Sequence, residues 1–225
     1  MIGGMDEAGR GPAIGPIVFG LVVLTEEQEK ILIDAGVKDS KALDENKRNT
    51  LLEIIKANSE FNNTKIVAAS EIDRLRGEGF TMNQIEVESF RALLQTYSGT
   101  LAKLQLDAAD VNEERFGSNF TDLTTGEIQS KHRGDALFVA VSAASICAKV
   151  VRDGEIKKLQ AQLKKSDPDL PSFGSGYPTD SKPFLRAYVK KYKELPKIAR
   201  KSWKTCSTIL DEITGDKQSS LDDFL

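Results

Sequence analysis

The sequence predicts an α/β protein in which helices pack on both faces of a sheet. Two observations lead to this class. Short apolar segments typical of strands lie near the N-terminus, and strand-like segments then alternate with helix-like ones. Hydrophobic content of 40% and charged content of 29% are ordinary for a globular protein, and 225 residues suffice for a sizeable core. No internal repeat or low-complexity segment interrupts the pattern.

The expected elements follow one another along the chain. Apolar runs bounded by turn residues predict strands at 2–6, 16–24, 64–70, 104–108 and, more weakly patterned, 126–131. Apolar spacing of three and four predicts helices at 44–56, 81–97 and 136–156, with an extension over 160–165. Asp44 is a suitable N-cap for the first helix. After two prolines, shorter helices are expected at 184–192 and 197–203, and regular structure is expected to end at Gly215.

Several classes of protein and site are disfavoured by composition. No apolar run approaches the ~20 residues that span a bilayer. The N-terminus lacks a basic segment followed by an apolar one, so we expect a cytoplasmic protein without a secretion signal. Two isolated cysteines, Cys147 and Cys206, and the single histidine, His132, cannot build a zinc site of the usual kind.

The most informative segment is the N-terminal one, where Asp6 and Glu7 are followed at once by Gly9, Arg10 and Gly11. Neighbouring side chains alternate along a strand, so both carboxylates can serve one site only where the strand ends or kinks. The glycines supply that freedom and allow backbone amides to approach an anionic ligand beside a guanidinium. A solvated acidic turn is the alternative interpretation.

Two further acids lie where a site would form. Asp107 follows a predicted strand, and Asp135 directly precedes the predicted buried helix. Each also has an ordinary interpretation, as a turn former and as a helix cap, and Asp110 competes with Asp107. Converging carboxylates require cations, and oxygen-only ligands select Mg²⁺ or Mn²⁺. Two such ions can clamp the attacking and leaving oxygens of a phosphodiester, which predicts phosphoryl-transfer hydrolysis.

The C-terminal third contains a basic segment on an otherwise acidic chain. Between Arg186 and Lys204 there are eight basic residues and one acidic residue, Glu194. That segment carries +7, so with a net charge of −3 the rest of the chain carries −10. This asymmetry predicts a polyanion-binding surface. A solvated helix face is the alternative.

Five motifs in this chain resemble those of ribonuclease HII. They are Asp6-Glu-Ala-Gly-Arg-Gly, Lys38-Asp-Ser-Lys, Gly134-Asp-Ala, the helix segment Ser142–Asp153, and Gly174-Ser-Gly-Tyr-Pro-Thr-Asp180. The resemblance extends to about Ser207. It implies an RNase H-like fold with a central mixed five-stranded sheet, flanking helices and a helical C-terminal part. It also implies endonucleolytic cleavage of RNA embedded in or joined to DNA, leaving 3′-hydroxyl and 5′-phosphate ends.

The resemblance assigns roles to individual residues. It implies that Asp6, Glu7, Asp107 and Asp135 are the catalytic ligands of two divalent ions. It implies that the Gly9-Arg10-Gly11 loop recognises the 2′-hydroxyl that distinguishes RNA from DNA. Tyr177 is implied to pack on the sugar of the following deoxynucleotide, and Lys41 to contact backbone phosphate. Ser142 and Lys149 belong to the matched helix without an assigned role, and His132 is expected in an exposed loop.

The C-terminal residues Gln218-Ser-Ser-Leu221-Asp-Asp-Phe224-Leu225 resemble a sliding-clamp-binding box. One 3₁₀-like turn would gather Leu221, Phe224 and Leu225 into an apolar plug beside Gln218. Such tails are typical of archaeal and eukaryotic replication and repair enzymes. A frayed amphipathic end is the alternative. We expect a catalytic domain over residues 1–210 and a tail over 211–225.

Two other functions share parts of this pattern. A nuclease with the same metals could act on a DNA junction, and a non-catalytic nucleic-acid adaptor could be tethered to the clamp. The complete carboxylate set argues against the adaptor, and the Gly-Arg-Gly motif with Tyr177 argues against a purely DNA-directed nuclease. The related ribonuclease HIII is disfavoured, because its glycine-rich motif differs and only five residues precede Asp6. We expect a monomer that binds RNA–DNA hybrids or ribonucleotide-containing duplex DNA, with no membrane partner.

Overall fold

The computed structural model describes residues 1–37 and 43–215. In this part of the chain one sheet has the strand order β3-β2-β1-β4-β5. Its strands are β1 (Ile2–Ala8), β2 (Ile17–Leu24), β3 (Phe61–Val67), β4 (Lys103–Asp107) and β5 (Glu127–Lys131). β1 pairs antiparallel with β2 and parallel with β4, and β4 pairs parallel with β5. The predicted mixed five-stranded sheet is therefore confirmed.

Helices connect and cover these strands. They are α1 (Glu26–Asp34), α2 (Glu45–Ala57), α3 (Ala69–Gly77), α4 (Met82–Leu94), α5 (Glu113–Ser118), α6 (Gly134–Leu137), α7 (Val139–Ser166), α8 (Pro178–Tyr192) and α9 (Lys204–Thr214). The Asp44 side chain accepts a hydrogen bond from the Lys47 amide, which confirms the predicted cap of α2. None of the helices in the described ranges is long and apolar enough to cross a bilayer.

Some predicted boundaries were wrong. β3 begins at Phe61 and ends at Val67, because the segment after it forms α3. The predicted helix over 136–156 is interrupted at Phe138, whose extended backbone separates α6 from α7. The predicted helix over 197–203 is instead a series of turns, and α9 follows it. α9 continues to Thr214, past residue 210, and the division into a catalytic domain and a tail stays a prediction.

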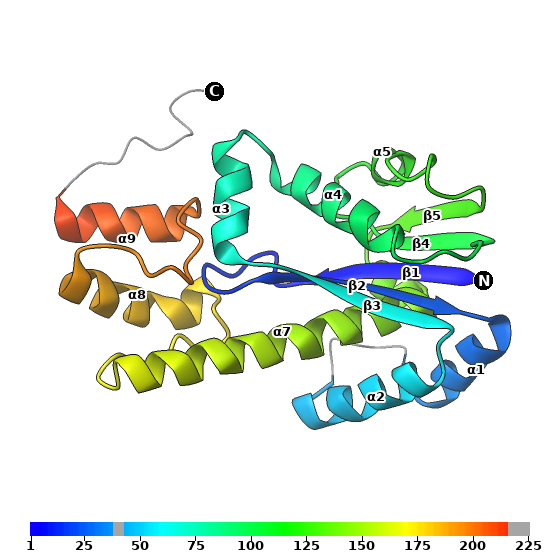
Figure 1. The fold of residues 1–225 in the computed structure, drawn as a ribbon, viewed down its shortest axis with the longest axis horizontal. Helices are drawn as coiled ribbons and strands as arrows, with labels where there is room; N and C mark the ends of the chain where they lie inside the picture. The colour runs from blue at the N-terminus through cyan, green and yellow to red at the C-terminus, as the bar shows by residue number, and fades with distance from the viewer. Residues whose placement is uncertain (38–42, 216–225) are drawn as a thin grey trace. The chain divides into compact units, whose positions relative to one another are not determined.

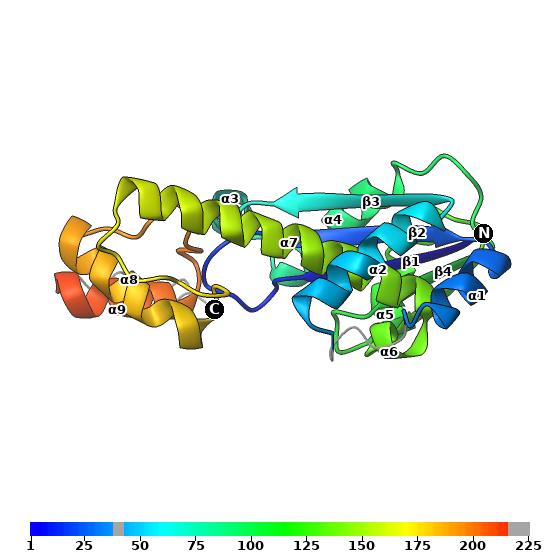
Figure 2. The ribbon, with the colours of Figure 1, turned by 90° about the horizontal axis from the view of Figure 1, so that it is seen from below.

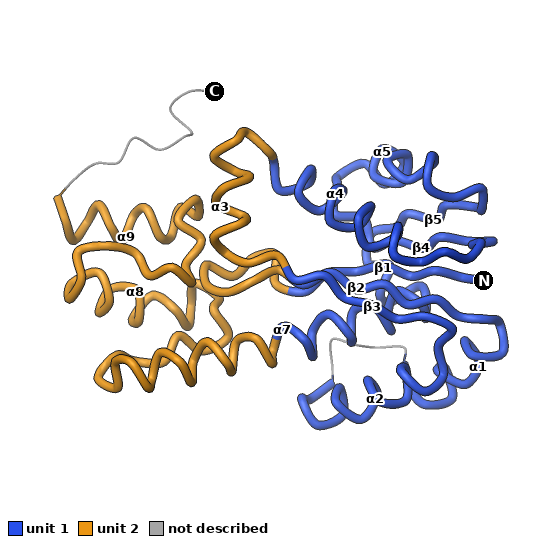
Figure 3. The backbone as a smooth tube through the Cα atoms, viewed as in Figure 1, with its two compact units in different colours: residues 1–8, 18–66, 81–152 blue, residues 9–17, 67–80, 153–225 orange. Residues whose placement is uncertain are grey.

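The polypeptide divides into two compact units, coloured separately in Figure 3. The first unit comprises residues 1–8, 18–66 and 81–152, and the second comprises residues 9–17, 67–80 and 153–225. The first unit therefore contains most of the sheet, and the second contains α3, α8, α9 and the end of α7.

In the first unit, helices cover both faces of the sheet. α4 and α5 lie on one side, whereas α1, α2 and the start of α7 lie on the other (Figures 1 and 2). Alternate residues of β2 contact these two layers, as the pleat requires. Phe19 packs edge-to-face on Phe90 of α4, with ring centroids 5.1 Å apart. Val22 and Leu24 instead join the apolar cluster formed with α1, α2 and α7.

α7 packs very closely against the central strands. A Cβ atom built on Gly4 of β1 would collide with the backbone of Ala140 and Val141. A Cβ atom on Gly20 of β2 would likewise collide with the carbonyl group of Ala144. Glycine on the strands and alanine on the helix therefore allow backbone-to-backbone packing, which places Ala140 against Gly4 of β1 and Ala144 against Gly20, the residue that pairs with Asp6.

The second unit has an apolar core of its own. Phe173 and Phe184 pack with ring centroids 5.4 Å apart, and both are fully buried. Ala13 and Ile14, from the loop after β1, are also buried in this cluster. The N-terminal loop is therefore fixed within the same core as α8 and α9.

This packing predicts opposite effects for two glycine-to-alanine substitutions. Gly4→Ala should lower the free energy of unfolding by more than about 2 kcal/mol, because the added methyl group meets backbone atoms that cannot rotate away. Gly154→Ala, inside α7 with open space around it, should raise that free energy by about 0.5–1 kcal/mol. Urea denaturation of both variants measures the difference, and equal effects would contradict the close packing.

Candidate active site

Asp6 lies near the C-terminal end of β1 and is almost completely buried. Its side chain is hydrogen bonded to Ser145 of α7, and its Oδ1 accepts the backbone N–H of Glu7 at 2.7 Å. Met5 of β1 pairs with Leu106 of β4, and the next residues along these parallel strands are Asp6 and Asp107. The strand register therefore makes these two carboxylates neighbours.

Asp107 ends β4 and holds the start of α6 in place. Its Oδ1 accepts the backbone N–H of Gly134 at 2.8 Å. A Cβ atom on Gly134 would lie 2.8 Å from the Leu106 carbonyl oxygen, so only glycine permits this approach. Asp135 follows directly and is 5% exposed. β1, β4 and α6 thus place Asp6, Asp107 and Asp135 in one region of the first unit.

Glu7 is the fourth predicted carboxylate, and β1 does not end where we expected. The strand continues through Ala8, and alternation alone would turn Glu7 away from Asp6, yet the Glu7 charge acts on the Asp6 carboxyl group. The backbone turns only afterwards, at Gly9, where φ is +91°. Across residues 1–37 and 43–215, no three acidic, histidine or cysteine side chains are already gathered around a single cation position.

This arrangement changes the pKa of the Asp6 carboxyl group. Burial raises the pKa of its carboxyl group well above the ordinary value, and the negative charges of Glu7 and Asp107 raise the pKa further. Hydrogen bonds from Ser145 and from the Glu7 amide act in the opposite direction but are weaker. An ionised Asp6 therefore favours a nearby cation. An all-oxygen set of this kind fits Mg²⁺ or Mn²⁺ and does not fit zinc.

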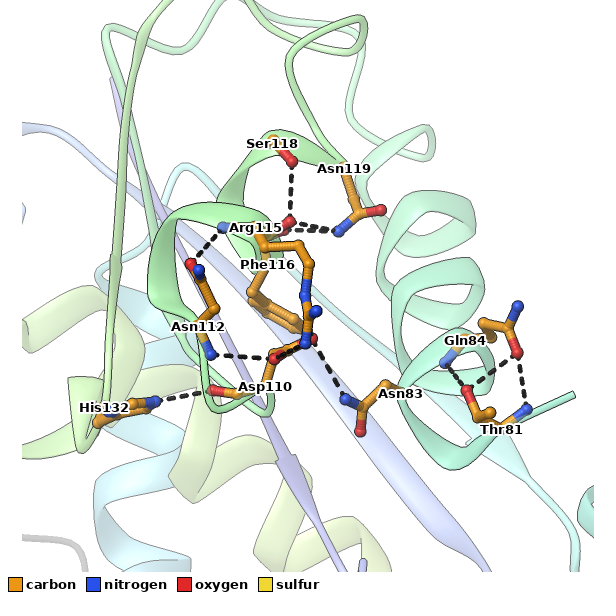
Figure 4. A network of polar contacts seen from close by, with 10 residues as sticks. All are labelled: Thr81, Asn83, Gln84, Asp110, Asn112, Arg115, Phe116, Ser118, Asn119 and His132. Atoms are coloured by element: carbon orange, nitrogen blue, oxygen red, sulfur yellow. Dashed lines mark hydrogen bonds and ion pairs between the residues drawn. The ribbon is translucent and has the colours of Figure 1, made fainter. Parts of the chain in front are cut away.

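Asp110, the competitor of Asp107, belongs to a separate polar network (Figure 4). Its carboxylate accepts hydrogen bonds from the Arg115 guanidinium and from the Asn112 amide, and the Arg115 contact holds its pKa at about 2. His132 contacts the backbone oxygen of Asp110 through Nε2 at 2.7 Å, and its side chain is exposed, as predicted. Asp110 therefore organises the loop before α5, which favours Asp107 as the carboxylate of the site.

The predicted ribose-binding residues come together in the second unit. A Cβ atom on Gly11 would lie 3.2 Å from Cε1 of Tyr177, so the tyrosine ring lies against the glycine. The amides of Ala13 and Ile14 both donate to the Gly176 carbonyl oxygen, at 2.9 and 3.2 Å. Tyr177 remains 46% exposed, so the ring retains a surface that a ligand can contact.

Sequence reasoning missed two residues of these sites. Ser145 lies in the quoted helix motif, but nothing in the sequence marked it as the partner of Asp6. Arg200 was counted in the basic segment, yet it is fully buried. Its guanidinium donates to three backbone carbonyl groups, those of Gly9, Arg10 and Gly15.

The rest of the basic segment is also less uniform than its composition predicts. Arg186 forms an ion pair with Glu212 at 2.7 Å, and Lys191 forms one with Asp167 at 2.6 Å. Lys191 and five further lysines of the segment have exposed side chains, the five being Lys190, Lys193, Lys197, Lys201 and Lys204. Lys41 and the tail residues Gln218, Leu221, Phe224 and Leu225 lie outside the described residues.

The two aspartates with opposite pKa shifts predict opposite stability changes. Above its raised pKa the ionised Asp6 destabilises the fold, so without divalent ions Asp6→Asn should raise Tm near pH 7. This gain should disappear as the pH falls through the raised pKa. Asp110→Asn should lower Tm near pH 7, and its effect should fade as the pH falls from about 4 to about 2. Calorimetric scans across pH test both signs, and a lower Tm for Asp6→Asn at neutral pH would contradict this account.

Known proteins share both the sequence and the fold of this chain. The family model for ribonuclease HII matches residues 3–206. The ribonuclease HII of Pyrococcus furiosus is 42% identical over 228 residues, covering 99% of this chain and 97% of the relative. The crystal structure of ribonuclease H2 from Pyrococcus horikoshii OT3 matches with a TM-score of 0.85 and 37% identity, covering 96% of this chain and 99% of that one.

A third relative is known in an assembly. The structure of the PCNA:RNase HII complex from Archaeoglobus fulgidus matches with a TM-score of 0.79 and 32% identity, covering 100% of both chains. These similarities confirm the RNase H-like fold predicted from the motifs. Because the family model and the relatives span nearly the whole sequence, the chain belongs to the ribonuclease HII family and is an endoribonuclease of the ribonuclease H type.

Proposed function

We propose that this enzyme hydrolyses the RNA strand of RNA–DNA hybrids and cleaves at ribonucleotides embedded in duplex DNA. The products carry 3′-hydroxyl and 5′-phosphate ends. The observation that carries this proposal is the buried Asp6 carboxylate beside Asp107, at the ends of two parallel central strands, with Asp135 next to them. The carboxyl ends of strands are the usual location of sites in α/β sheets.

The catalytic centre uses Asp6, Glu7, Asp107 and Asp135 to hold divalent ions, Mg²⁺ or Mn²⁺. When bound, two such ions activate water and neutralise the charge that develops on the phosphodiester. Burial and the charges of Glu7 and Asp107 raise the pKa of Asp6, so its ionised form gains most from a cation. Ser145 and the Glu7 amide orient its oxygens. Asp107 orients the helix start that carries Asp135.

Recognition of the ribose is a second element of the proposal. The Gly9-Arg10-Gly11 loop reads the 2′-hydroxyl, and Tyr177 packs on the sugar of the following deoxynucleotide. The contact between the tyrosine ring and Gly11 supports a shared binding surface. The exposed lysines of the basic segment and Lys41 contact backbone phosphates, which positions the duplex without reading its sequence.

Two alternatives use the same features differently. A nuclease directed at DNA junctions would need the carboxylates but not the ribose-contacting loop. A non-catalytic adaptor would need neither a buried acidic centre nor a ribose contact. We infer a cytoplasmic enzyme. We also infer that it is monomeric, because the chain itself supplies both the acidic centre and the loop.

Cleavage of end-labelled duplex DNA with one ribonucleotide tests the function and the choice of aspartate together. Wild-type enzyme with Mg²⁺ or Mn²⁺ should cut only the ribonucleotide-containing strand, and an all-DNA duplex should stay intact. Asp107→Ala should reduce the rate by at least about 100-fold, whereas Asp110→Ala should stay within about threefold of wild type. Cutting of the all-DNA duplex at a comparable rate would instead support the junction nuclease.

The C-terminal tail carries a motif that would bind a partner protein. Gln218, Leu221, Phe224 and Leu225 follow the pattern of a clamp-binding box. The Archaeoglobus fulgidus relative is known in complex with PCNA, which supports the same kind of partner for this chain. We infer that the tail binds a sliding clamp and takes no part in hydrolysis.

Removal of the tail should separate recruitment from catalysis. Deleting residues 219–225 should leave turnover on a short oligonucleotide unchanged, because the acidic centre and the ribose-contacting loop lie far upstream. Calorimetric titration with the clamp of the same organism should show saturable binding by the full chain and none by the truncated one. Phe224→Ala should remove most of the affinity, since one buried aromatic residue usually dominates a small interface. Equal binding by both chains would rule out the tail as the clamp ligand.

A further inference from the structure

The buried Arg200 is connected to the ribose-contacting loop by an unusual set of hydrogen bonds. Its Nε donates to the Gly15 carbonyl oxygen at 3.0 Å, and its two terminal nitrogens donate to Arg10 and Gly9 at 2.8 and 2.6 Å. The side chain is 0% exposed. A fully buried guanidinium is expensive to desolvate, so its hydrogen bonds must compensate for the lost hydration. One guanidinium group therefore holds both ends of the segment 9–15, which begins with the Gly9-Arg10-Gly11 loop.

The segment that carries Arg200 is itself firmly held within the second unit. The Arg200 amide donates to the Ala13 carbonyl oxygen, and the Gly15 amide donates to that of Ile198, both at 2.9 Å. The guanidinium carbon lies 4.9 Å from the centre of the Trp203 ring, so the indole covers one face of the cation. Asp73 accepts hydrogen bonds from the amides of the two residues after Arg200. The guanidinium therefore acts on the loop from a rigid support.

The geometry of the peptide bond determines what this contact does to the loop. In a trans peptide the N–H points away from the preceding carbonyl group, and the described chain contains no cis peptide bond. Because the carbonyl groups of Gly9 and Arg10 point to the guanidinium, the amides of Arg10 and Gly11 point away from it. The positive charge also polarises these peptide groups and makes their amides better donors.

We propose that Arg200 is a positioning residue for ribonucleotide selectivity, because it orients the Arg10 and Gly11 amides toward the 2′-hydroxyl of the substrate. This inference rests on the proposed function of the Gly9-Arg10-Gly11 loop. Arg200 touches neither the substrate nor the acidic centre in this role. It acts through backbone atoms, so its loss should change ribose recognition and leave phosphate contacts in place.

Arg200→Lys is the informative substitution. Lysine keeps the charge, but its single ammonium group cannot meet three separate carbonyl groups as the planar guanidinium does. The matched control is Arg74→Lys, an exposed arginine of α3 that forms ion pairs with Glu71 and Glu78. Both substitutions exchange arginine for lysine in the second unit, and only Arg200 contacts the loop.

The measurement compares Kd values for two duplexes that differ only in one 2′-hydroxyl group. Fluorescence anisotropy in EDTA avoids cleavage, and the ratio of the two Kd values does not depend on the fraction of active protein. Wild type and Arg74→Lys should bind the ribonucleotide duplex several-fold more tightly than the all-DNA duplex. Arg200→Lys should reduce this ratio to less than about a third, while the Kd for the all-DNA duplex stays within about twofold.

The possible outcomes separate this inference from the function on which it rests. If the wild type binds both duplexes with the same Kd, the loop does not recognise the ribose, and the proposed role of Arg200 is overturned as well. If the wild type discriminates and folded Arg200→Lys keeps the ratio, only the positioning role is overturned. Equal weakening of both duplexes would also overturn it. If Arg200→Lys does not fold, the same ratio of Kd values is measured for Trp203→Leu, which uncovers the guanidinium. A reduced ratio would support the positioning role, and an unchanged ratio would overturn it.

Discussion

The contact between α7 and the two central strands is the constraint on which the acidic centre depends. Gly4 and Gly20 allow the backbone of α7 to lie directly against β1 and β2, with Ala140 and Ala144 at the contact. A helix this close excludes water from the end of β1, so Asp6 is buried there. The same packing brings the Ser145 hydroxyl to the carboxylate. The small residues of the core therefore determine the electrostatics of the site.

Burial of a carboxylate beside two others destabilises the folded state, and the chain accepts this cost at Asp6. Asp110, only a few residues beyond Asp107, is neutralised by Arg115 and has a lowered pKa. The contrast separates a carboxylate that supports a loop from one whose charge is left for a cation. Such local destabilisation is expected at a functional site, where a bound ligand compensates for it.

The second unit restrains the glycine-rich loop Gly9-Arg10-Gly11. Glycine permits close approach of the backbone to a ligand but makes the loop conformationally free. Here the freedom is removed by contacts from distant parts of the chain, through Gly176 and Arg200. Composition alone counts Arg200 with the lysines of the basic segment, yet it is buried and hydrogen bonded to the loop. A basic residue in a basic segment therefore has a structural environment that composition cannot reveal.

The sequence by itself determined the α/β class, most strands, the cap of α2 and the motifs of the site, because these depend on local periodicity and residue type. It did not determine α1, α3 or α5, where charged residues mask the apolar spacing. It named Asp107 for the site with Asp110 as a competitor, since Asp107 ends β4 and Asp110 follows it closely. The tertiary structure adds support for Asp107, because the strand register places it beside Asp6 while Asp110 forms an ion pair with Arg115. The partners Ser145 and Arg200 were likewise decided by tertiary structure, because their contacts join residues more than 100 positions apart in the sequence, and no local pattern records such a pairing.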